Sequence, residues 1–432
     1  MKPSAKEKQR LSRRRFLASG LMAAAGTGLA SAQSAAADGT TNVANASVLT
    51  DATEPFWGKH QAGIVTPSQK HAYLAAFDLT TNDRADIIEM LKSWTAAAAR
   101  MSQGQTAEPL GQEASKPAAD SGDALELSPA RLTVTFGFGA GLFMKDGKDR
   151  YGLASQRPAA LVDLPKFTGD QLVEARTGGD LLVQACADDP QVAFHAVRQL
   201  SRLAYDTAQI RWVQTGFTAD SKPGQTPRNL MGFKDGTNNP SVKDSNSMDK
   251  FVWVDQADPA WMRNGSYVVV RRIRIALEHW DRMNLAFQEQ TVGRHKYSGA
   301  PLGGTKESDK PDYDATDSDG NSIIPENAHI RLGSAETNDS AQILRRPYSY
   351  NDGANFTAER WPPWRQEMEF DAGLLFICYQ RDPRTGFIKI FDKMSKFDMM
   401  NQFVTHTGGG LFACPGGVST GGYIGQRLFE KA

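Results

Sequence analysis

One short stretch of the chain places a single carboxylate inside a turn, where it could exchange protons with a bound molecule. The stretch is Gly232-Phe233-Lys234-Asp235-Gly236-Thr237-Asn238-Asn239-Pro240. Glycine tolerates positive φ, so Gly236 lets the backbone approach a ligand directly after Asp235. The same residues also fit an ordinary Asx-type turn between two elements. Asp235 is therefore a candidate proton carrier if other reactive side chains join it.

Two further segments supply such side chains. They are His329-Ile330-Arg331-Leu332 and Ile343-Leu344-Arg345-Arg346, and Arg345 follows His329 by sixteen positions. Neutral imidazole is the commonest protein ligand of metal ions, and an arginine carries a fixed positive charge. Taken alone, however, an arginine pair is typical of a solvated surface, and a lone histidine is more often structural than ligating.

Together these segments resemble the dye-decolorizing haem peroxidases. Gly232-Phe233-Lys234-Asp235-Gly236 matches the GxxDG motif of that family, and residues 56–67 (FWGKHQAGIVTP) match its opening strand. With the leader described below, the resemblance narrows to the exported deferrochelatase/peroxidase branch. It covers essentially the whole chain after the leader, and it implies one non-covalently bound haem b per chain.

The resemblance implies a role for each candidate residue. His329 would be the proximal ligand of the haem iron, and Asp398 would accept the proton of its second ring nitrogen. Asp235 would carry the proton that peroxide loses from one oxygen and gains on the other, beside the fixed charge of Arg345. An aspartate stands here where other peroxidases have a histidine, which favours activity in acid.

The resemblance also predicts the residues around the haem edge. Gly236, Thr237, Asn238 and Asn239 are expected to approach the edge and a propionate, and Arg345 to contact the haem. Close relatives follow the histidine segment with an Asn-Pro-Arg-like turn, whereas this chain has Gly333-Ser334-Ala335-Glu336. An arginine for the propionate is thus missing, and Arg331 is the expected substitute.

The N-terminus predicts export. Ser12-Arg13-Arg14-Arg15-Phe16-Leu17 precedes a mildly apolar run, with Ala-x-Ala cleavage sites after Ala32 and Ala37. This pattern is typical of a twin-arginine signal over residues 1–37, read by the twin-arginine export machinery. The run is too short and too rich in small residues for a membrane anchor. The expected destination is the periplasm, or the extracellular space in a host without an outer membrane.

Composition is that of an ordinary globular protein. The 432 residues are 40% hydrophobic, and the formal net charge is zero. Because residues 1–37 hold seven Lys or Arg and one Glu, the remainder is acidic, and nothing indicates nucleic-acid binding. The three cysteines, Cys186, Cys378 and Cys414, are far apart and form no Cys-x-x-Cys pair. They are expected to be buried free thiols, which leaves no thiol pair for covalent haem attachment.

The order of elements predicts a duplicated fold. Apolar alternation predicts strands at 71–79, 131–138, 180–186, 210–217, 267–277 and 374–379, and helical spacing predicts helices at 83–101, 191–205, 278–293 and 384–403. Residues 180–190 and 373–383 look alike, and both end in Asp-Pro, a helix-start signal. We therefore predict an α+β fold of two ferredoxin-like βαββαβ halves with antiparallel sheets.

The expected domains are the leader at 1–37, an N-terminal half at 56–225 and a C-terminal half at 226–432. The candidate residues Asp235, His329 and Arg345 all belong to the C-terminal half, which is where we expect the haem pocket. We expect the two sheets to leave this pocket at their junction. The polar insertion at 299–340 must carry His329 to it.

Three functions remain open from the sequence. The first is a haem peroxidase that reduces hydrogen peroxide and oxidises dyes, phenols or similar donors. The second is an iron-acquisition protein, a deferrochelatase that removes iron from haem, leaves the porphyrin intact and works with iron-uptake partners. The third is a non-enzymatic binding module in which Asp235 only forms a turn. A homo-oligomer, most simply a dimer, is expected from the family resemblance.

Overall fold

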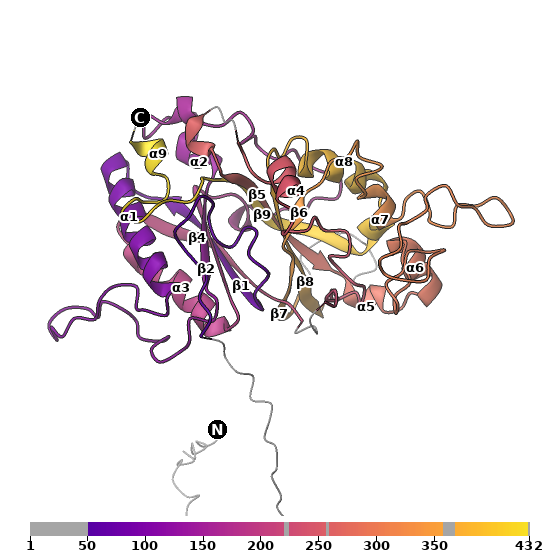
Figure 1. The fold of residues 1–432 in the computed structure, drawn as a ribbon, viewed down its shortest axis with the longest axis horizontal. Coiled ribbons are helices and arrows are strands. Elements are labelled where there is room, and N and C mark those ends of the chain that lie inside the picture. The colour runs from indigo at the N-terminus through magenta and orange to yellow at the C-terminus, as the bar shows by residue number, and fades with distance from the viewer. Residues whose placement is uncertain (1–50, 220–223, 256–258, 357–367, 431–432) are drawn as a thin grey trace, which may run out of the picture. The chain divides into compact units, whose positions relative to one another are not determined.

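The computed structural model describes residues 51–219, 224–255, 259–356 and 368–430. The predicted leader at 1–37 lies outside these residues. Leu49–Ala432 forms one compact unit, drawn in Figure 1. Among the helices of the described ranges, none combines the length and the apolar character that crossing a membrane requires.

The N-terminal half contains one four-stranded antiparallel sheet with two long helices. Its strands pair in the order β4-β1-β3-β2, as in a ferredoxin-like unit. Asp83 and Asp189 accept backbone N–H groups at the starts of the two helices, and Pro190 occupies the first turn of the second. The elements are β1 (His71–Leu79), α1 (Arg84–Met101), β2 (Thr133–Phe138), α2 (Ala140–Phe143), β3 (Leu181–Ala187), α3 (Pro190–Leu203) and β4 (Ala208–Phe217).

The C-terminal half repeats this topology. Its main strands pair in the order β9-β5-β8-β7, and the short β6 also pairs with β8. The elements are α4 (Ser245–Phe251), β5 (Ser266–Ile275), α5 (Leu277–Trp280), α6 (Leu285–Val292), α7 (His329–Leu332), β6 (Leu344–Arg345), β7 (Tyr348–Phe356), β8 (Met368–Gln380), α8 (Phe387–Phe397), β9 (Val404–Cys414) and α9 (Gln426–Phe429). The predicted α+β fold of duplicated ferredoxin-like halves is confirmed.

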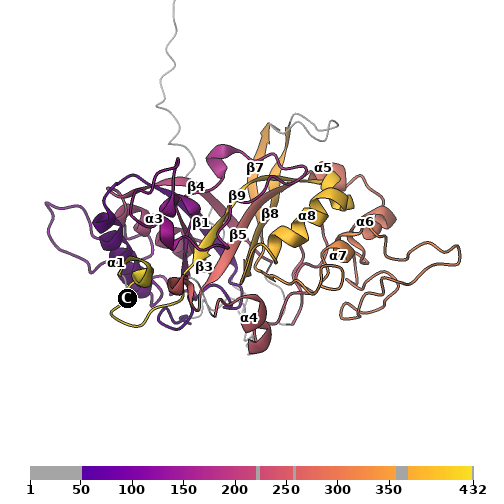
Figure 2. The ribbon, with the colours of Figure 1, turned by 90° about the horizontal axis from the view of Figure 1, so that it is seen from above.

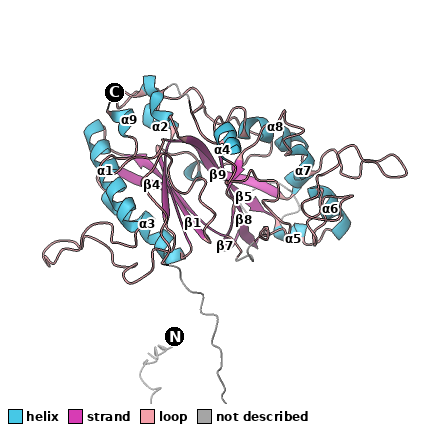
Figure 3. Cartoon of the chain, viewed as in Figure 1, coloured by secondary structure: helices cyan, strands magenta, loops and turns pink. Residues whose placement is uncertain are grey.

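The two sheets join at both edges. Phe138 of β2 pairs with Ala413 of β9, and Phe217 of β4 pairs with Ser349 of β7, so eight strands form a closed ring. Apolar side chains of both halves fill its interior. Figure 2 shows α1 and α3 beside the strands of one half and α8 beside those of the other, and Figure 3 shows the strands running between these helices.

Two predicted helices are shorter than expected. Residues 278–293 form α5 and α6 instead of one helix, because the Asn284 side chain accepts the Phe287 N–H and starts a new helix. Residues 384–403 form α8 and a 3-10 turn, because Asp398 adopts an extended conformation between them. Asp398 therefore lies after the helix instead of on it.

Two other segments differ from the prediction. The Asp-Pro signal at Asp382 does not start α8, because Phe387 N–H is accepted by the Gln380 side chain and the helix begins there. Residues 56–67, expected as an opening strand, form bends and turns. Here the Gln61 side chain bonds to both backbone groups of Phe136 on β2, at 2.8 and 3.0 Å, so a side chain takes the place of a strand neighbour.

Candidate active site

The C-terminal half contains a cavity of about 260 Å³. Leu374 and Phe376 of β8 line it, whereas the intervening Leu375 belongs to the interior cluster of the ring. The cavity thus lies on the outer face of this sheet, beneath α8, and not at the junction of the two sheets as we expected. Residues three and four apart on α8 supply its other apolar wall: Phe387, Ile390, Phe391 and Met394.

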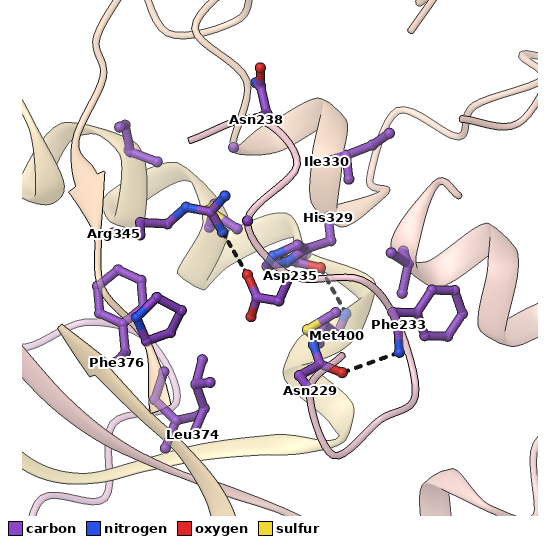
Figure 4. A pocket seen from close by; sticks show the side chains of 18 of the residues that line it. Asn229, Phe233, Asp235, Asn238, His329, Ile330, Arg345, Leu374, Phe376 and Met400 are labelled. Carbon is purple, nitrogen blue, oxygen red and sulfur yellow. Dashed lines mark hydrogen bonds and ion pairs between the residues drawn. The ribbon is translucent and has the colours of Figure 1, made fainter. Parts of the chain in front are cut away.

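The turn around Asp235 enters this cavity (Figure 4). Asn229 Oδ1 accepts the N–H groups of Met231 and Phe233, at 3.1 and 3.3 Å, and folds the preceding chain back on itself. Gly236 has a φ of 123°, a conformation that side chains rarely adopt. The Asp235 N–H donates to the Pro227 carbonyl at 2.9 Å, so backbone geometry holds the carboxylate in place.

Asp235 is paired with Arg345. The Arg345 Nη1 donates to Asp235 Oδ1 at 3.0 Å, and both side chains are largely buried. Arg345 ends β6, and its backbone N–H and C=O both bond to the Asn239 side-chain amide at 2.8 Å. Asn239 therefore fastens the Asp235 turn to the strand that presents the arginine, and this fixes the spacing of the pair.

His329 begins α7 and lines the same cavity. Its Nδ1 lies 2.7 Å from Asp398 Oδ2, and the other Asp398 oxygen accepts the Met400 N–H at 2.8 Å. The carboxylate is 3% exposed and so has one fixed orientation. Because Nδ1–H donates to it, the imidazole presents Nε2 as its free lone pair.

The electrostatic environment of His329 favours a strong ligand. Burial lowers the pKa of His329, but the neighbouring Asp398 carboxylate more than offsets this, and the pKa is raised above its usual value. The side chain is 37% exposed, and this area faces the cavity that it lines. Its basicity and its access to the cavity suit an imidazole that binds a metal.

Other predicted contacts differ in their outcome. Gly236, Thr237 and Asn238 line the cavity. Asn239 is not among the lining residues, because its amide is occupied by the Arg345 backbone. Arg331 is also absent from the lining: it donates to the Ile324 carbonyl at 3.0 Å and lies over the Tyr313 ring. Neither residue therefore lines the cavity, and a contact of Asn239 or Arg331 with a propionate stays a prediction.

Sequence reasoning missed three polar lining or supporting residues. Arg294 is a buried cation in the cavity wall, and it donates to the Gly299 carbonyl at 2.7 Å. Glu307 bonds to Lys234 and Thr237, on either side of Asp235. His406 of β9 lines the cavity with an imidazole that is 8% exposed. For the cavity wall, the only usable signal in the sequence was the helical spacing of the apolar residues on α8, and this spacing does not indicate the polar residues. Glu307 lies in a polar insertion without periodicity.

The residues of this cavity fit a haem. Its walls are mostly apolar, as a porphyrin requires. One imidazole presents a free Nε2, with its other nitrogen held by a carboxylate, which is the arrangement of a metal-binding histidine. The buried, unpaired thiols of all three cysteines are consistent with non-covalent binding.

Glu307 is expected to position Asp235. Its carboxylate forms an ion pair with Lys234 and accepts a hydrogen bond from the Thr237 hydroxyl at 3.0 Å. Glu307 therefore contacts the turn on both sides of Asp235. Burial acts to raise the pKa of Glu307, but bonds from Lys234 and its hydroxyl partners keep it lowered. For the haem peroxidase that the resemblance implies, we predict that Glu307→Ala lowers peroxide turnover by roughly 10–100-fold, because a misplaced catalytic group costs about this much.

The measurement is steady-state turnover at equal haem content. Glu336→Ala is a matched control, because it removes an exposed ion pair with Lys310 in the same insertion and should leave turnover unchanged. Full turnover in Glu307→Ala would show that the turn holds its position without this brace.

His406 is expected to make the protein sensitive to acid. Burial and the nearby Arg271 lower its pKa well below the usual value, and its Nδ1 is buried without a hydrogen-bond partner. The unfolded chain, but not the folded one, binds a proton here below pH ~6.5. The free energy of unfolding should therefore fall by up to ~1.4 kcal/mol per pH unit below that point.

The test compares urea unfolding of the wild type and His406→Gln between pH 5 and 7.5. The variant lacks the titrating group, so its stability should fall less steeply below pH ~6.5. Parallel curves for the two proteins would exclude His406 as the source of the acid sensitivity.

Comparisons with known proteins agree with this geometry. The sequence profile described as "Dyp-type peroxidase, N-terminal" matches residues 61–218, and the one described as "Dyp-type peroxidase, C-terminal" matches residues 226–419. Curated relatives from Escherichia coli K12 and Shigella flexneri, each described as a deferrochelatase, are 38% identical over 387 residues. The two alignments cover 87% of this chain and 87–88% of the relatives' chains.

Solved structures are similar across the same region. A DyP-type peroxidase from Streptomyces coelicolor is 42% identical with a TM-score of 0.80, and covers 88% of this chain and 98% of its own. One from Cellulomonas bogoriensis is 39% identical with a TM-score of 0.77, and covers 88% and 99%. Ferric DtpA from Streptomyces lividans is 42% identical with a TM-score of 0.78, and covers 88% and 97%.

Proposed function

The chain belongs to the Dyp-type peroxidase family, and from this membership we propose that it is a haem peroxidase that works with the residues of the C-terminal cavity. The observation that carries the proposal is that one cavity contains both an imidazole held by a carboxylate and an aspartate–arginine pair. The first arrangement suits an iron ligand, and the second suits proton transfer beside a fixed charge.

His329 and Asp398 would hold the cofactor. His329 Nε2 binds the iron of one non-covalent haem b, and Asp398 keeps the proton on Nδ1 and fixes the ring orientation. The bound haem supplies the redox-active iron at which peroxide is reduced and electrons are taken from a donor. Arg294, the buried cation in the wall, is the residue that we propose for the haem propionate, together with Asn238.

Asp235 and Arg345 would act on peroxide. Asp235 Oδ1 is held by Arg345, which leaves Oδ2 to take the proton from one peroxide oxygen and return it to the oxygen that leaves as water. The Arg345 guanidinium stabilises the negative charge that develops on peroxide after the proton has moved. The apolar walls limit the water that competes for these groups.

A second activity is favoured by the curated relatives that are described as deferrochelatases. We infer that the same cavity can bind haem as a substrate, release its iron and leave the porphyrin intact. The leader residues around Arg13-Arg14 support export by the twin-arginine pathway to the periplasm, where such an activity would supply iron-uptake partners. We also propose that the chain divides into halves at 56–225 and 226–432. The protein would form a homodimer.

Product analysis distinguishes the two activities. The chain from residue 38 onward is loaded with haem and given hydrogen peroxide with an anthraquinone dye, and dye loss, free iron and iron-free porphyrin are measured together. Oxidised dye with intact haem supports the peroxidase. Iron-free porphyrin in amounts equal to the released iron supports the deferrochelatase. Neither product above the level given by free haem would overturn the proposed function.

A further inference from the structure

A cluster of three side chains lies in the N-terminal half, away from the active-site cavity. Asp120 and Asp123 belong to the long connection between α1 and β2, and His195 belongs to α3. One potential ligand atom from each of the three lies within 4.8 Å of the other two. None of the three lines the C-terminal cavity, so peroxide chemistry gives no reason for this cluster.

Hydrogen bonds determine which nitrogen of His195 is free. Its Nδ1 lies 2.9 Å from Asp123 Oδ1, so Nδ1 carries the proton and donates it. Its Nε2 then has a bare lone pair, and it lies 3.4 Å from Asp120 Oδ2. This distance exceeds the usual ~2.7–3.2 Å of an N–H···O bond. Two lone pairs face each other here, and a positive charge between them would make the contact favourable.

Negative charge is also concentrated in the cluster. The Asp120 side chain is fully buried, and Asp123 Oδ2 is buried without a hydrogen-bond partner. Arg198 lies 3.4 Å from Asp123 Oδ1, but its side chain is half-exposed. The Asp120 oxygens accept the backbone N–H groups of Ala107 and Gly122 at 2.9 and 2.8 Å, but these donors carry no full charge. Buried carboxylates are normally paired or bound to a metal, so these bonds and one half-exposed arginine offset only part of the negative charge.

Space is available beside the cluster. Asp120 and His195 line a cavity of about 60 Å³, and Glu126 is a second acidic residue in its wall. This volume exceeds the ~30 Å³ that one water takes in the liquid. A cation at the cluster could therefore keep one or two water ligands from the cavity.

We propose that Asp120, Asp123 and His195 form a binding site for a divalent transition cation of the zinc class. His195 Nε2 and Asp120 Oδ2 are the protein ligands, Asp123 keeps the proton on His195 Nδ1, and water completes the shell. A mixed nitrogen and oxygen donor set suits Zn²⁺ better than Ca²⁺ or Mg²⁺, which prefer oxygen alone. The bound cation would fasten the connection between α1 and β2 to α3.

The experiment uses the haem-loaded chain from residue 38 onward, so that the haem site cannot take up zinc. The protein is treated with a chelator, dialysed and titrated with ZnCl₂, and zinc per chain and the melting temperature are measured. The wild type should bind one Zn²⁺ and melt at a higher temperature with it. Asp123→Asn should bind zinc roughly 10–100-fold more weakly, as for other residues that support a metal ligand, and His195→Gln should bind more weakly still.

His295→Gln is the matched control. His295 Nδ1 also lies 2.9 Å from a carboxylate, that of Glu289, but no third ligand from the described part of the chain completes a cluster there. This variant should bind zinc as the wild type does. The absence of saturable binding in the wild type, or equal affinity in His195→Gln, would overturn the proposal and leave a protonated His195 between two carboxylates. If the variants fail to fold, the zinc X-ray absorption spectrum of the wild type decides: an imidazole ligand supports the site, and a shell of oxygen alone excludes it.

Discussion

Replacing His329 with alanine is expected to remove most of the bound haem and all peroxide turnover above that of free haem. The chain would lose the only imidazole among its described residues that lines the cavity with one ring nitrogen held by a carboxylate. His406 also lines the cavity, but it has no such partner. Haem per chain, from absorption and iron analysis, is the measurement.

The control for this prediction is His295→Ala. His295 also bonds to a carboxylate in the C-terminal half, but it does not line the cavity, so haem content should not change. Asp398→Asn should give an intermediate result, with haem affinity or turnover reduced roughly 10–100-fold. A His329→Ala variant with wild-type haem content and spectrum would show that another residue binds the iron.

His329 also gives haem binding a pH dependence. Burial lowers its pKa, but Asp398 more than offsets this and the net pKa is raised. In the haem-free protein a proton therefore competes with iron for the ring at neutral and lower pH. Haem affinity should rise as the pH passes upward through the raised pKa, and a flat affinity between pH 5 and 8 would argue against ligation by this ring.

The Asp235→Asn substitution is expected to lower peroxide turnover by about 10²–10⁴-fold, the usual contribution of a positioned proton carrier. Asparagine keeps the shape of the side chain and its contact with Arg345, but cannot take up and return a proton. Haem content should stay at the wild-type level, because Asp235 holds the turn through its backbone. Stopped-flow and steady-state measurements with peroxide give the rate.

A matched control for this variant is Asp78→Asn. Asp78 is as buried as Asp235 and forms a 2.9 Å ion pair with Arg211, but it lies in the N-terminal half, so turnover should not change. Arg345→Leu alone and combined with Asp235→Asn completes a double-mutant cycle. Because the two side chains are 3.0 Å apart, their effects should not add. Additive losses, or full activity in Asp235→Asn, would contradict a shared role.

The fold could largely be predicted from the sequence because its signals are local. Alternation of apolar residues located the strands around Ala75 and Val183, and Asp189-Pro190 marked the start of α3. The likeness between residues 180–190 and 373–383 indicated the duplication. Helix ends were less predictable: Asn284 interrupts a segment of helical spacing through one side-chain bond.

The active site could be predicted only in part. The motif match identified His329, Asp235 and Arg345 as candidate site residues, and all three line one cavity in the structure. The alternation of side chains shows that a strand such as β8 has two faces, but it does not show which face borders a cavity. The Asn239 amide bonds to the backbone of Arg345, which is distant in sequence, and Arg331 bonds to the carbonyl of Ile324 in an irregular loop. No spacing pattern predicts such contacts.

The most direct test of the central claim is a haem titration of the wild-type chain from residue 38 onward, followed by peroxide and a dye. A haem peroxidase with one haem-binding cavity should saturate at one haem per chain, with the absorption spectrum of an imidazole-bound iron. The loaded protein should then oxidise the dye much faster than an equal concentration of free haem. Absence of saturable binding, or turnover no faster than that of free haem, would contradict the account.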